Sequence, residues 1–232
     1  MEKQKYAAIV LAAGSGKRMN SQVHKQHLII QDRPVLYYSL KAFEDSAVDE
    51  IVLVVGKGEE EFCRKEIVDK YGISKVKAIV EGGKERYHSV FEGLKQTSDA
   101  DYVLIHDGAR PFVNQDIIRR CMQEVQKYQA CVVGMPVKDT IKIADEEGYA
   151  KQTPDRKNVW MIQTPQTFSY ALIYEAYEEM LKTEDTAITD DAMVLERIKG
   201  KKSKLIEGSY RNIKITTPED LLIANVYLQH PE

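Results

Sequence analysis

The chain of 232 residues lacks several features that would fix its class at once. Its three cysteines, Cys63, Cys121 and Cys131, are odd in number and do not have the spacing of a metal site. Because each lies in an apolar or amphipathic stretch, we expect buried or half-buried free thiols. No apolar run approaches the roughly 20 residues of a membrane helix. The first residues have no apolar segment followed by a cleavage site. These absences predict a cytoplasmic protein that does not bind a membrane.

Neither sign of charge dominates the chain. The 33 lysines and arginines stand against 36 aspartates and glutamates, which gives a formal net charge of −3. Because there is no basic excess, we expect no nucleic-acid partner, and a site for an acidic substrate has to be a local cluster of basic residues. Repeats, low-complexity segments and linkers are also absent. We therefore expect residues 1–232 to form a single domain, with an arm subdomain at about residues 137–158.

Short apolar segments alternate with amphipathic ones in the first part of the chain. The apolar segments are typical of strands buried on both faces: Tyr6–Leu11, Ile51–Val55, Val76–Val80, Tyr102–His106 and Ala130–Gly134. The amphipathic segments predict helices: Pro34–Phe43, Glu59–Lys70, Glu85–Leu94 and Asn114–Tyr128. This alternation predicts an α/β fold with a Rossmann-like, mostly parallel twisted sheet flanked by helices. Ligands of such sheets bind beyond the carboxyl ends of the strands.

After Val137 the pattern changes to short polar segments. We expect Thr140–Ala144 and Tyr149–Gln152 to pair as a hairpin, because the four residues between them form a turn signal that ends in glycine. A polar two-stranded ribbon is marginal alone, so we interpret it as a projecting β-hairpin arm for dimerisation. Further strands and helices are expected at Val159–Phe168, Tyr170–Leu181, Thr189–Arg197 and Ser203–Glu207, and a last helix is expected to be capped by Thr217.

The loop from Leu11 to Lys25 follows the first predicted strand and carries Gly14, Gly16 and Arg18. Glycines at this position let the backbone N–H groups approach an anion, so the loop predicts a phosphate site. Its spacing is not that of a P-loop, and it lacks the third glycine of the dinucleotide fingerprint. What remains is a loop of backbone donors with basic side chains nearby, which is typical of phosphoryl and nucleotidyl transfer. The alternative is that these basic residues are only solvated surface residues.

Two further strand ends carry polar residues with open alternatives. Asp107 is either an oxygen ligand for Mg²⁺ or a structural residue that caps the next turn or pairs with Arg110. We interpret His106 as a hydrogen-bonded structural histidine. The turn at Gly82, with Arg86 and Ser89 after it, suits base or ribose recognition, although a simple tight turn explains the glycine equally well. The segment Thr189-Asp190-Asp191 is interpreted as an ordinary helix cap.

Six motifs in a fixed order resemble those of the 2-C-methyl-D-erythritol 4-phosphate cytidylyltransferases of the non-mevalonate isoprenoid pathway, over nearly the whole chain. The motifs are Leu11-Ala12-Ala13-Gly14-x-Gly16-x-Arg18-Met19, Lys25-Gln26, Gly82-Gly83-x-x-Arg86-x-x-Ser89-Val90, His106-Asp107-x-Ala109-Arg110-Pro111, Gln163-Thr164-Pro165-Gln166 and Ile213-Lys214-x-Thr216-x-Pro218-Glu219-Asp220. The resemblance implies that CTP and the erythritol phosphate give 4-diphosphocytidyl-2-C-methyl-D-erythritol and pyrophosphate.

The resemblance also implies a role for each site residue. The CTP-binding residues would be Ala12, Ala13, Gly14, Gly16, Gly82, Ser89, Asp107 and Ala109. The catalytic cations would be Arg18, Lys25 and Lys214, and Asp107 would bind Mg²⁺ or another divalent cation. The acceptor phosphate would be held by Thr140, Arg156 and Lys214. Since the arm embraces a second subunit in this family, Thr140 and Arg156 are implied to act in the partner's site of a homodimer.

Three other functions compete with this one. A ribitol 5-phosphate cytidylyltransferase would share the fold and the nucleotide, but Ala13 and Ala109 favour the erythritol enzyme. A sugar-1-phosphate nucleotidyltransferase is disfavoured by the motifs around Gly82 and Thr164. A catalytically silent nucleotide-binding protein is disfavoured because the basic and acidic site residues are all present.

Overall fold

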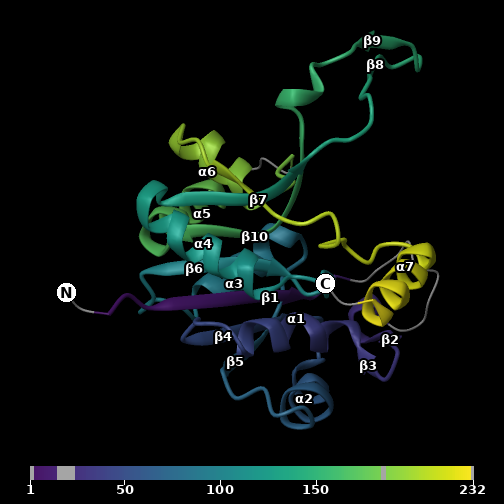
Figure 1. Cartoon of the computed structure of the whole chain (residues 1–232). Coiled ribbons are helices and arrows are strands. Elements are labelled where there is room, and N and C mark those ends of the chain that lie inside the picture. Colours follow the sequence, from purple (N-terminus) through teal and green to yellow (C-terminus); the bar gives the residue numbers. More distant parts are fainter. Residues whose placement is uncertain (1–2, 15–23, 184–186, 231–232) are drawn as a thin grey trace.

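The structure, a computed structural model, describes residues 3–14, 24–183 and 187–230. A seven-stranded sheet lies at its centre, in the order β11-β7-β10-β6-β1-β4-β5 (Figure 1). Its strands are β1 (Tyr6–Ala12), β4 (Glu50–Val55), β5 (Val76–Glu81), β6 (Tyr102–Asp107), β7 (Ala130–Pro136), β10 (Trp160–Ser169) and β11 (Lys204–Glu207). Every neighbouring pair is parallel except the two that involve β10. The predicted mostly parallel sheet is confirmed, and the antiparallel direction of β10 was not predicted.

Strand β1 explains why both faces of the sheet are covered. The helices around it are α1 (Val35–Glu44), α2 (Glu60–Cys63), α3 (Arg86–Leu94), α4 (Gln115–Tyr128), α5 (Tyr170–Met180), α6 (Asp191–Lys199) and α7 (Pro218–Gln229). Ala8 and Val10 pack into one buried cluster together with α1, α2 and α4, whereas Ala7 and Ile9 pack into another with α3, α5 and α6. Successive side chains of a strand point to opposite faces, so a strand between two cores is apolar throughout.

The register of the central strands brings their carboxyl ends to one edge. Leu11 of β1 pairs with Asp107 of β6, and Val55 of β4 pairs with Glu81 of β5. Backbone hydrogen bonds continue past the strands, because Gly108 N–H donates to the Leu11 carbonyl at 2.8 Å. The loops that follow β6, β1, β4 and β5 therefore start at the same edge of the sheet, as expected for a site beyond the ends of parallel strands.

Helix α7 secures the segment that carries Lys214. Ala224 of α7 packs with Ile215, and with Ile30 and Val35 near the small hairpin of β2 (Ile29–Ile30) and β3 (Arg33–Pro34), in a third buried cluster. The N–H of Ile215 donates to the Ala109 carbonyl at 2.8 Å, which ties this segment to the loop after β6. The predicted cap of α7 is confirmed, since Thr217 and Asp220 form a capping box with Pro218 as the first residue of the helix. The hairpin β2–β3 was not predicted.

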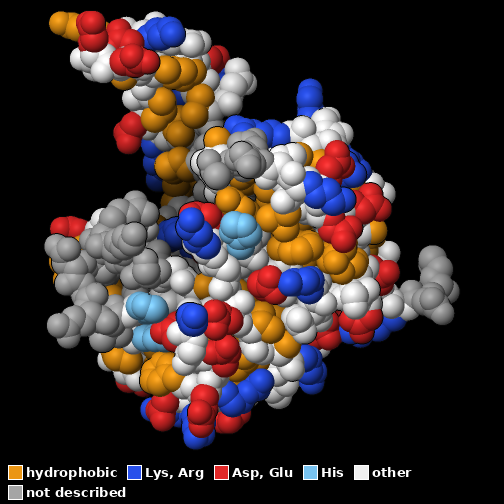
Figure 2. All heavy atoms as spheres, turned by 180° about the vertical axis from the view of Figure 1, so that it is seen from behind, with side chains coloured by type: hydrophobic (Ala, Val, Ile, Leu, Met, Phe, Trp, Pro, Cys, Tyr) orange, Lys and Arg blue, Asp and Glu red, His pale blue; other side chains and the backbone are white. Residues whose placement is uncertain are grey.

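Residues 137–158 form an arm that stands out from the sheet (Figures 1 and 2). Its strands are only β8 (Ile143–Ala144) and β9 (Ala150–Gln152), followed by the 3₁₀ helix η4 (Arg156–Asn158). All residues of the two strands are exposed. The predicted strands Thr140–Ala144 and Tyr149–Gln152 were too long, because a polar ribbon without a packing layer sustains little pairing. The predicted turn is confirmed, with Asp145 N–H bonded to the Tyr149 carbonyl at 2.9 Å.

The helix after β4 and the burial of the three cysteines were also predicted. The predicted helix Glu59–Lys70 is divided into α2 and a π-helical segment η3 (Arg64–Asp69). The three cysteines are free and buried, as predicted. Among the described residues, no helix combines the length and the apolar character that crossing a membrane requires.

Candidate active site

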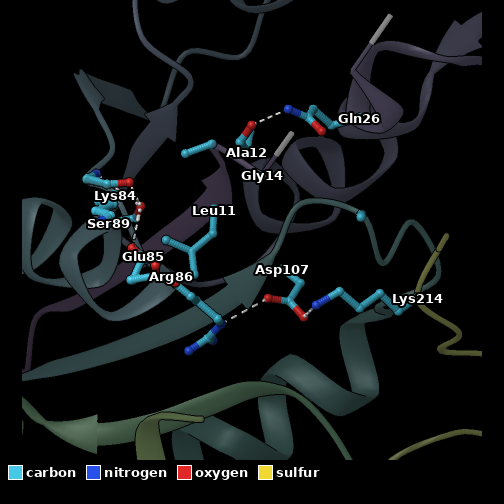
Figure 3. Close-up of a pocket in the computed structure, with 13 residues that line it drawn as sticks. Leu11, Ala12, Gly14, Gln26, Lys84, Glu85, Arg86, Ser89, Asp107 and Lys214 are labelled. Atoms are coloured by element: carbon cyan, nitrogen blue, oxygen red, sulfur yellow. Dashed lines mark hydrogen bonds and ion pairs between the residues drawn. The ribbon is translucent and has the colours of Figure 1, made fainter. Parts of the chain in front are cut away.

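The first cavity, of about 490 Å³, opens beyond the carboxyl ends of the central strands (Figure 3). Predicted site residues that line it are Ala12, Ala13, Gly14, Ser89, Asp107, Ala109 and Lys214. It is also lined by Arg86, which was considered for base or ribose recognition, and by residues that were not predicted as site residues: Leu11, Gln26, Gly83, Lys84 and Glu85. Gly16 and Arg18 lie outside the described residues, and of Lys25 the structure describes the backbone, in the 3₁₀ helix η2 (Lys25–His27).

Gly82 lies behind the wall of this cavity, where the loops after β1 and β5 touch. A Cβ atom at Gly82 would lie 2.5 Å from the Ala13 Cβ and 2.7 Å from the Ser89 Oγ, so glycine is required by the close approach. Ser89 Oγ accepts from the Gly83 N–H at 3.1 Å and donates to the Glu85 carbonyl at 3.2 Å. The hydroxyl therefore shapes the turn, and the residues of this turn, from Gly83 to Glu85, line this rim of the cavity.

Gln26 is a site residue that the sequence reasoning missed. It is buried, and its Nε2 donates to the Ala12 carbonyl at the end of β1 (Figure 3). This bond fastens η2, and with it the backbone of Lys25, beside the first cavity. The only signal in the sequence was its position next to Lys25 in the second motif.

Asp107 lies at the centre of a cluster of three cations. Its Oδ2 is 2.8 Å from the Lys214 Nζ and 3.6 Å from the Arg110 Nε, and its Oδ1 is 3.5 Å from the Arg86 Nε. Burial alone would raise the pKa of Asp107, but Lys214, Arg86 and Arg110 hold that pKa well below its usual range. The carboxylate is therefore ionised at neutral pH. The ion pair with Arg110, which was one of the predicted alternatives for Asp107, is present.

This cluster limits how a metal ion could bind. Mg²⁺ in nucleotide sites is usually held by one or two carboxylates together with substrate phosphates. Within the described residues, no group of three or more His, Cys, Asp or Glu side chains could hold a metal ion. Asp107 already has three cations beside it. The residues therefore fit a cation that arrives with phosphate oxygens, and they do not form a metal site by themselves.

His106 precedes Asp107 and has a structural role. It is fully buried, with Nδ1 3.0 Å from the Thr164 Oγ1 and Nε2 3.2 Å from the Arg110 carbonyl. Burial lowers its pKa to about 4, so the ring is neutral at pH 7. The Thr164 hydroxyl also accepts from the Asp107 N–H at 3.0 Å, next to the cis Thr164–Pro165 peptide bond. The interpretation of His106 as a hydrogen-bonded structural histidine is confirmed.

Arg86 does not take the position expected of a residue that reads a base or ribose. Its Nη1 and Nη2 donate to the two oxygens of Asp191 at 2.7 and 2.8 Å. Burial alone would lower the pKa of Arg86, but Asp191 and Asp107 raise it above its ordinary value. The interpretation of Thr189-Asp190-Asp191 was right for Asp190, which caps α6, and wrong for Asp191, whose carboxylate is fully buried against Arg86.

A second cavity of about 240 Å³ adjoins the first. Arg86, Asp107 and Lys214 line both cavities, so this cluster forms the wall between them. The remaining lining of the second cavity is Arg110, Ile162, Gln163, Thr164, Gln166, Thr189 and Asp190. Among the described residues that line the two cavities there is no histidine, and therefore no Ser–His pair. Adjacent cavities joined by fixed cations suit a reaction between two anions.

Two predicted acceptor residues lie elsewhere in the chain. Thr140 and Arg156 are exposed on the arm, and neither lines the first or the second cavity. The Arg156 Nη1 donates to the Lys138 carbonyl, also on the arm, at 3.2 Å. A single chain thus brings Lys214 to the second cavity without Thr140 or Arg156.

Comparisons with known proteins agree over nearly the whole chain. A protein-family model described as 2-C-methyl-D-erythritol 4-phosphate cytidylyltransferase matches residues 6–230. The protein of that name from Lachnoclostridium phytofermentans is 50% identical over 226 residues, covering 97% of each chain. The one from Lachnospira eligens is 54% identical over 224 residues, covering 96% of this chain and 98% of the relative. The crystal structure of 4-diphosphocytidyl-2C-methyl-D-erythritol synthase from Anaerococcus prevotii has a TM-score of 0.86 at 38% identity, covering 98% of this chain and 97% of that one.

Proposed function

The chain belongs to the 2-C-methyl-D-erythritol 4-phosphate cytidylyltransferase family, and we propose that its two adjoining cavities hold the two substrates of that reaction. As a nucleotidyltransferase, it joins the cytidylyl group of CTP to the erythritol phosphate and releases pyrophosphate. CTP occupies the first cavity, and the erythritol phosphate occupies the second. The observation that carries this assignment is the shared wall, because Arg86, Asp107 and Lys214 line both cavities.

The chemistry explains the composition of that wall. A phosphate oxygen of the erythritol phosphate attacks the α-phosphorus of CTP, and the bond from this phosphorus to the bridging oxygen of pyrophosphate breaks. The electron pair of that bond leaves with pyrophosphate. The nucleophile is already an anion, so no general base is needed. The obstacle is the approach of two anions, which fixed cations and correct positioning overcome.

Lys214 is the cation best placed to serve both substrates. Its Nζ is 2.8 Å from the Asp107 Oδ2, at the boundary of the cavities, and its side chain is 36% exposed. An ammonium held by a carboxylate beside two cavities can contact the attacking phosphate and the α-phosphate together. By family resemblance, Arg18 and Lys25 complete the set of catalytic cations, and the position of η2 beside Ala12 supports the assignment of Lys25.

The nucleotide contacts come from the rim of the first cavity. We assign CTP binding to the loop with Ala12, Ala13, Gly14 and Gly16, to the turn at Gly82 and Ser89, and to Asp107 and Ala109. The base then meets backbone groups that the Ser89 hydroxyl holds in place. A divalent cation such as Mg²⁺ would be held by the phosphates of CTP, with Asp107 as its protein ligand, and would supply charge neutralisation.

The arm supplies the rest of the acceptor site from a second subunit. Ile143 and Tyr149 are exposed hydrophobic residues on the arm, which stands clear of the body (Figure 2). Such side chains on a marginal ribbon favour burial against another chain. In the homodimer, Thr140 and Arg156 of one subunit hold the erythritol phosphate in the site of its partner. The cytoplasmic location and the absence of a nucleic-acid partner stay predictions.

Pyrophosphate release by the purified chain tests the function. We expect release with CTP, Mg²⁺ and 2-C-methyl-D-erythritol 4-phosphate together, and none when any of the three is omitted. Ribitol 5-phosphate in place of the erythritol phosphate, and UTP in place of CTP, should give far lower rates. Faster turnover of ribitol 5-phosphate would contradict the proposed acceptor.

A further inference from the structure

Asp191 is a buried carboxylate to which the proposed reaction assigns no role. It is the first residue of α6 and is fully buried. Its two oxygens accept from both terminal nitrogens of Arg86, and its Oδ1 also accepts from the Tyr177 hydroxyl at 2.6 Å. The helix does not need it as a cap, because Asp190 already accepts from the Met193 N–H at 2.8 Å.

The pairing with Asp191 decides which part of Arg86 faces the active site. With both terminal nitrogens directed at Asp191, the Nε is the nitrogen of Arg86 that faces Asp107, at 3.5 Å. Arg86 therefore faces the Oδ1 of Asp107, whereas the Oδ2 faces Lys214 at 2.8 Å and the Arg110 Nε at 3.6 Å. Alternating charges connect α6 to the ammonium at the wall between the cavities, in the order Asp191, Arg86, Asp107, Lys214 (Figure 3 shows the last three).

Gln166 holds the far end of this chain of charges in place. Its Oε1 accepts from the N–H groups of Asp191 and Ala192 at 3.0 and 2.9 Å, and its Nε2 donates to Asp190 at 3.0 Å. These bonds fix the start of α6 against β10. A buried ion pair contributes little net stability compared with an apolar pair of similar volume. This ion pair joins α3 to α6 and is also held from α5 by Tyr177 and from β10 by Gln166. An ion pair fixed in this way beside a reactive site is better explained by positioning.

We propose that Asp191 is a positioning residue: it holds the Arg86 guanidinium so that Asp107 presents its Oδ2 to Lys214 and keeps that ammonium between the two substrates. This inference rests on the proposed function, because it gives Lys214 the catalytic role. Without the Asp191 charge, a terminal nitrogen of Arg86 is released and competes with Lys214 for Asp107.

Asp191→Asn is the direct test, because it keeps the volume and removes the charge. We expect kcat per folded enzyme to fall roughly 10- to 100-fold, as for a misplaced catalytic group, with KM for CTP little changed. Asp49→Asn is the matched control. Asp49 accepts from the Tyr6 N–H at 2.9 Å and pairs with Lys3, at the amino end of the sheet. Its substitution should leave kcat unchanged.

The same substitution in a Lys214→Ala background separates positioning from general stability. If Asp191 acts through Lys214, Asp191→Asn lowers kcat no further in that background. A full additional loss there, or an unchanged kcat in Asp191→Asn alone, would overturn the proposal. If Lys214→Ala alone kept the wild-type rate, the catalytic role of Lys214 would fail as well, and that single variant would reveal it.

If Asp191→Asn does not fold, Tyr177→Phe provides the test. It removes the hydroxyl that donates to Asp191 and retains every charge. We expect about a fivefold loss in kcat, the size of one hydrogen bond, and again no further loss in the Lys214→Ala background. A thermal midpoint that falls while kcat stays at the wild-type value would mean that this network is only structural.

Discussion

The end of β6 and the arm of residues 137–158 both supply charged residues to the proposed reaction, yet they are built in opposite ways. Asp107 is buried and has Lys214, Arg86 and Arg110 within 3.6 Å. Arg156 is exposed on the arm, where its Nη1 donates to the Lys138 carbonyl. One region has its charges placed before any substrate arrives, and the other holds its charges away from both cavities of its own chain.

The difference separates two costs of binding an anionic substrate. Charges fixed inside the protein need no reorganisation during the reaction, so the cost of placing them is met on folding. In the proposed homodimer, charges on the arm would keep their hydration until the second subunit and the acceptor are present. We therefore expect substitutions at the end of β6 to affect the rate and the fold, and substitutions on the arm to affect acceptor binding.

Lys214→Ala should have the largest effect. Removing a fixed cation from the site of a developing charge typically costs a hundred- to thousandfold in kcat, or about 2.7–4 kcal/mol. Because the Lys214 side chain is 36% exposed, the fold should survive the change. Pyrophosphate release at saturating CTP and erythritol phosphate measures the effect.

A matched Lys→Ala change tests whether position matters. Lys201 follows the end of α6, donates to the side chain of Gln129 and lines neither cavity. We expect Lys201→Ala to keep the wild-type rate. If Lys214→Ala also retained nearly full activity, the contrast between the buried cluster and the arm would lose its functional meaning.

Much of the fold could be predicted because strands buried on both faces have apolar residues at nearly every position. The runs at Tyr6–Leu11 and Ile51–Val55 are apolar throughout, and their parallel pairing sets the carboxyl ends side by side. The first cavity follows from that geometry, so the glycine loop with Gly14 and the residue Asp107 could be placed there from their positions after strand ends, whereas the assignment of Ala12 came from the family resemblance.

The second cavity could not be predicted in the same way. Its lining combines Arg86 of α3 with residues of β10, which returns antiparallel beside β6, and with Asp190 before α6. Arg86 also pairs with Asp191, which is 105 positions away. The sequence around Arg86 and around Asp191 does not indicate that these two side chains pair. An acidic residue at the start of a helix is an ordinary feature. Long-range pairing of buried charges is therefore the part that sequence reasoning missed.

The stability of the protein should depend on pH through the buried end of β6. The pKa of His106 is lowered from 6.5 to about 4 by burial, so the unfolded chain takes up a proton before the folded protein does. As pH falls from about 6.5 to about 4, His106 should lower the free energy of unfolding by about 3 kcal/mol. Above pH 6.5 it has no such effect, because the ring is neutral in both states.

Urea denaturation of His106→Gln at several pH values isolates this contribution. The variant is expected to be less stable at pH 7, since two hydrogen bonds change, but to lose less stability between pH 6.5 and 4 than the wild type. His230→Gln, at an exposed position near the carboxyl end, should keep the wild-type pH dependence. Equal pH dependence in all three proteins would rule out His106 as its source.

Arg156→Ala should have the smallest effect and should act on acceptor binding alone. Loss of a charged hydrogen bond to the acceptor phosphate should raise KM for the erythritol phosphate about tenfold. The thermal midpoint should not change, because Arg156 is exposed and its Nη1 bonds to a carbonyl on the same arm. Steady-state kinetics with each substrate varied in turn would detect the difference from Lys214→Ala, which acts on kcat.

Mixed dimers then decide whether the arm serves its own chain or its partner. When Arg156→Ala chains associate with Lys214→Ala chains, action in the partner's site leaves one site per mixed dimer with both Arg156 and Lys214 intact. Random association of equal amounts should therefore restore about a quarter of the wild-type sites in a two-fold symmetric dimer. If the arm served its own chain, no site of any dimer would hold both residues, and mixing would restore nothing. Recovery on mixing would mean that the buried cluster of one chain and the exposed arm of another form one acceptor site.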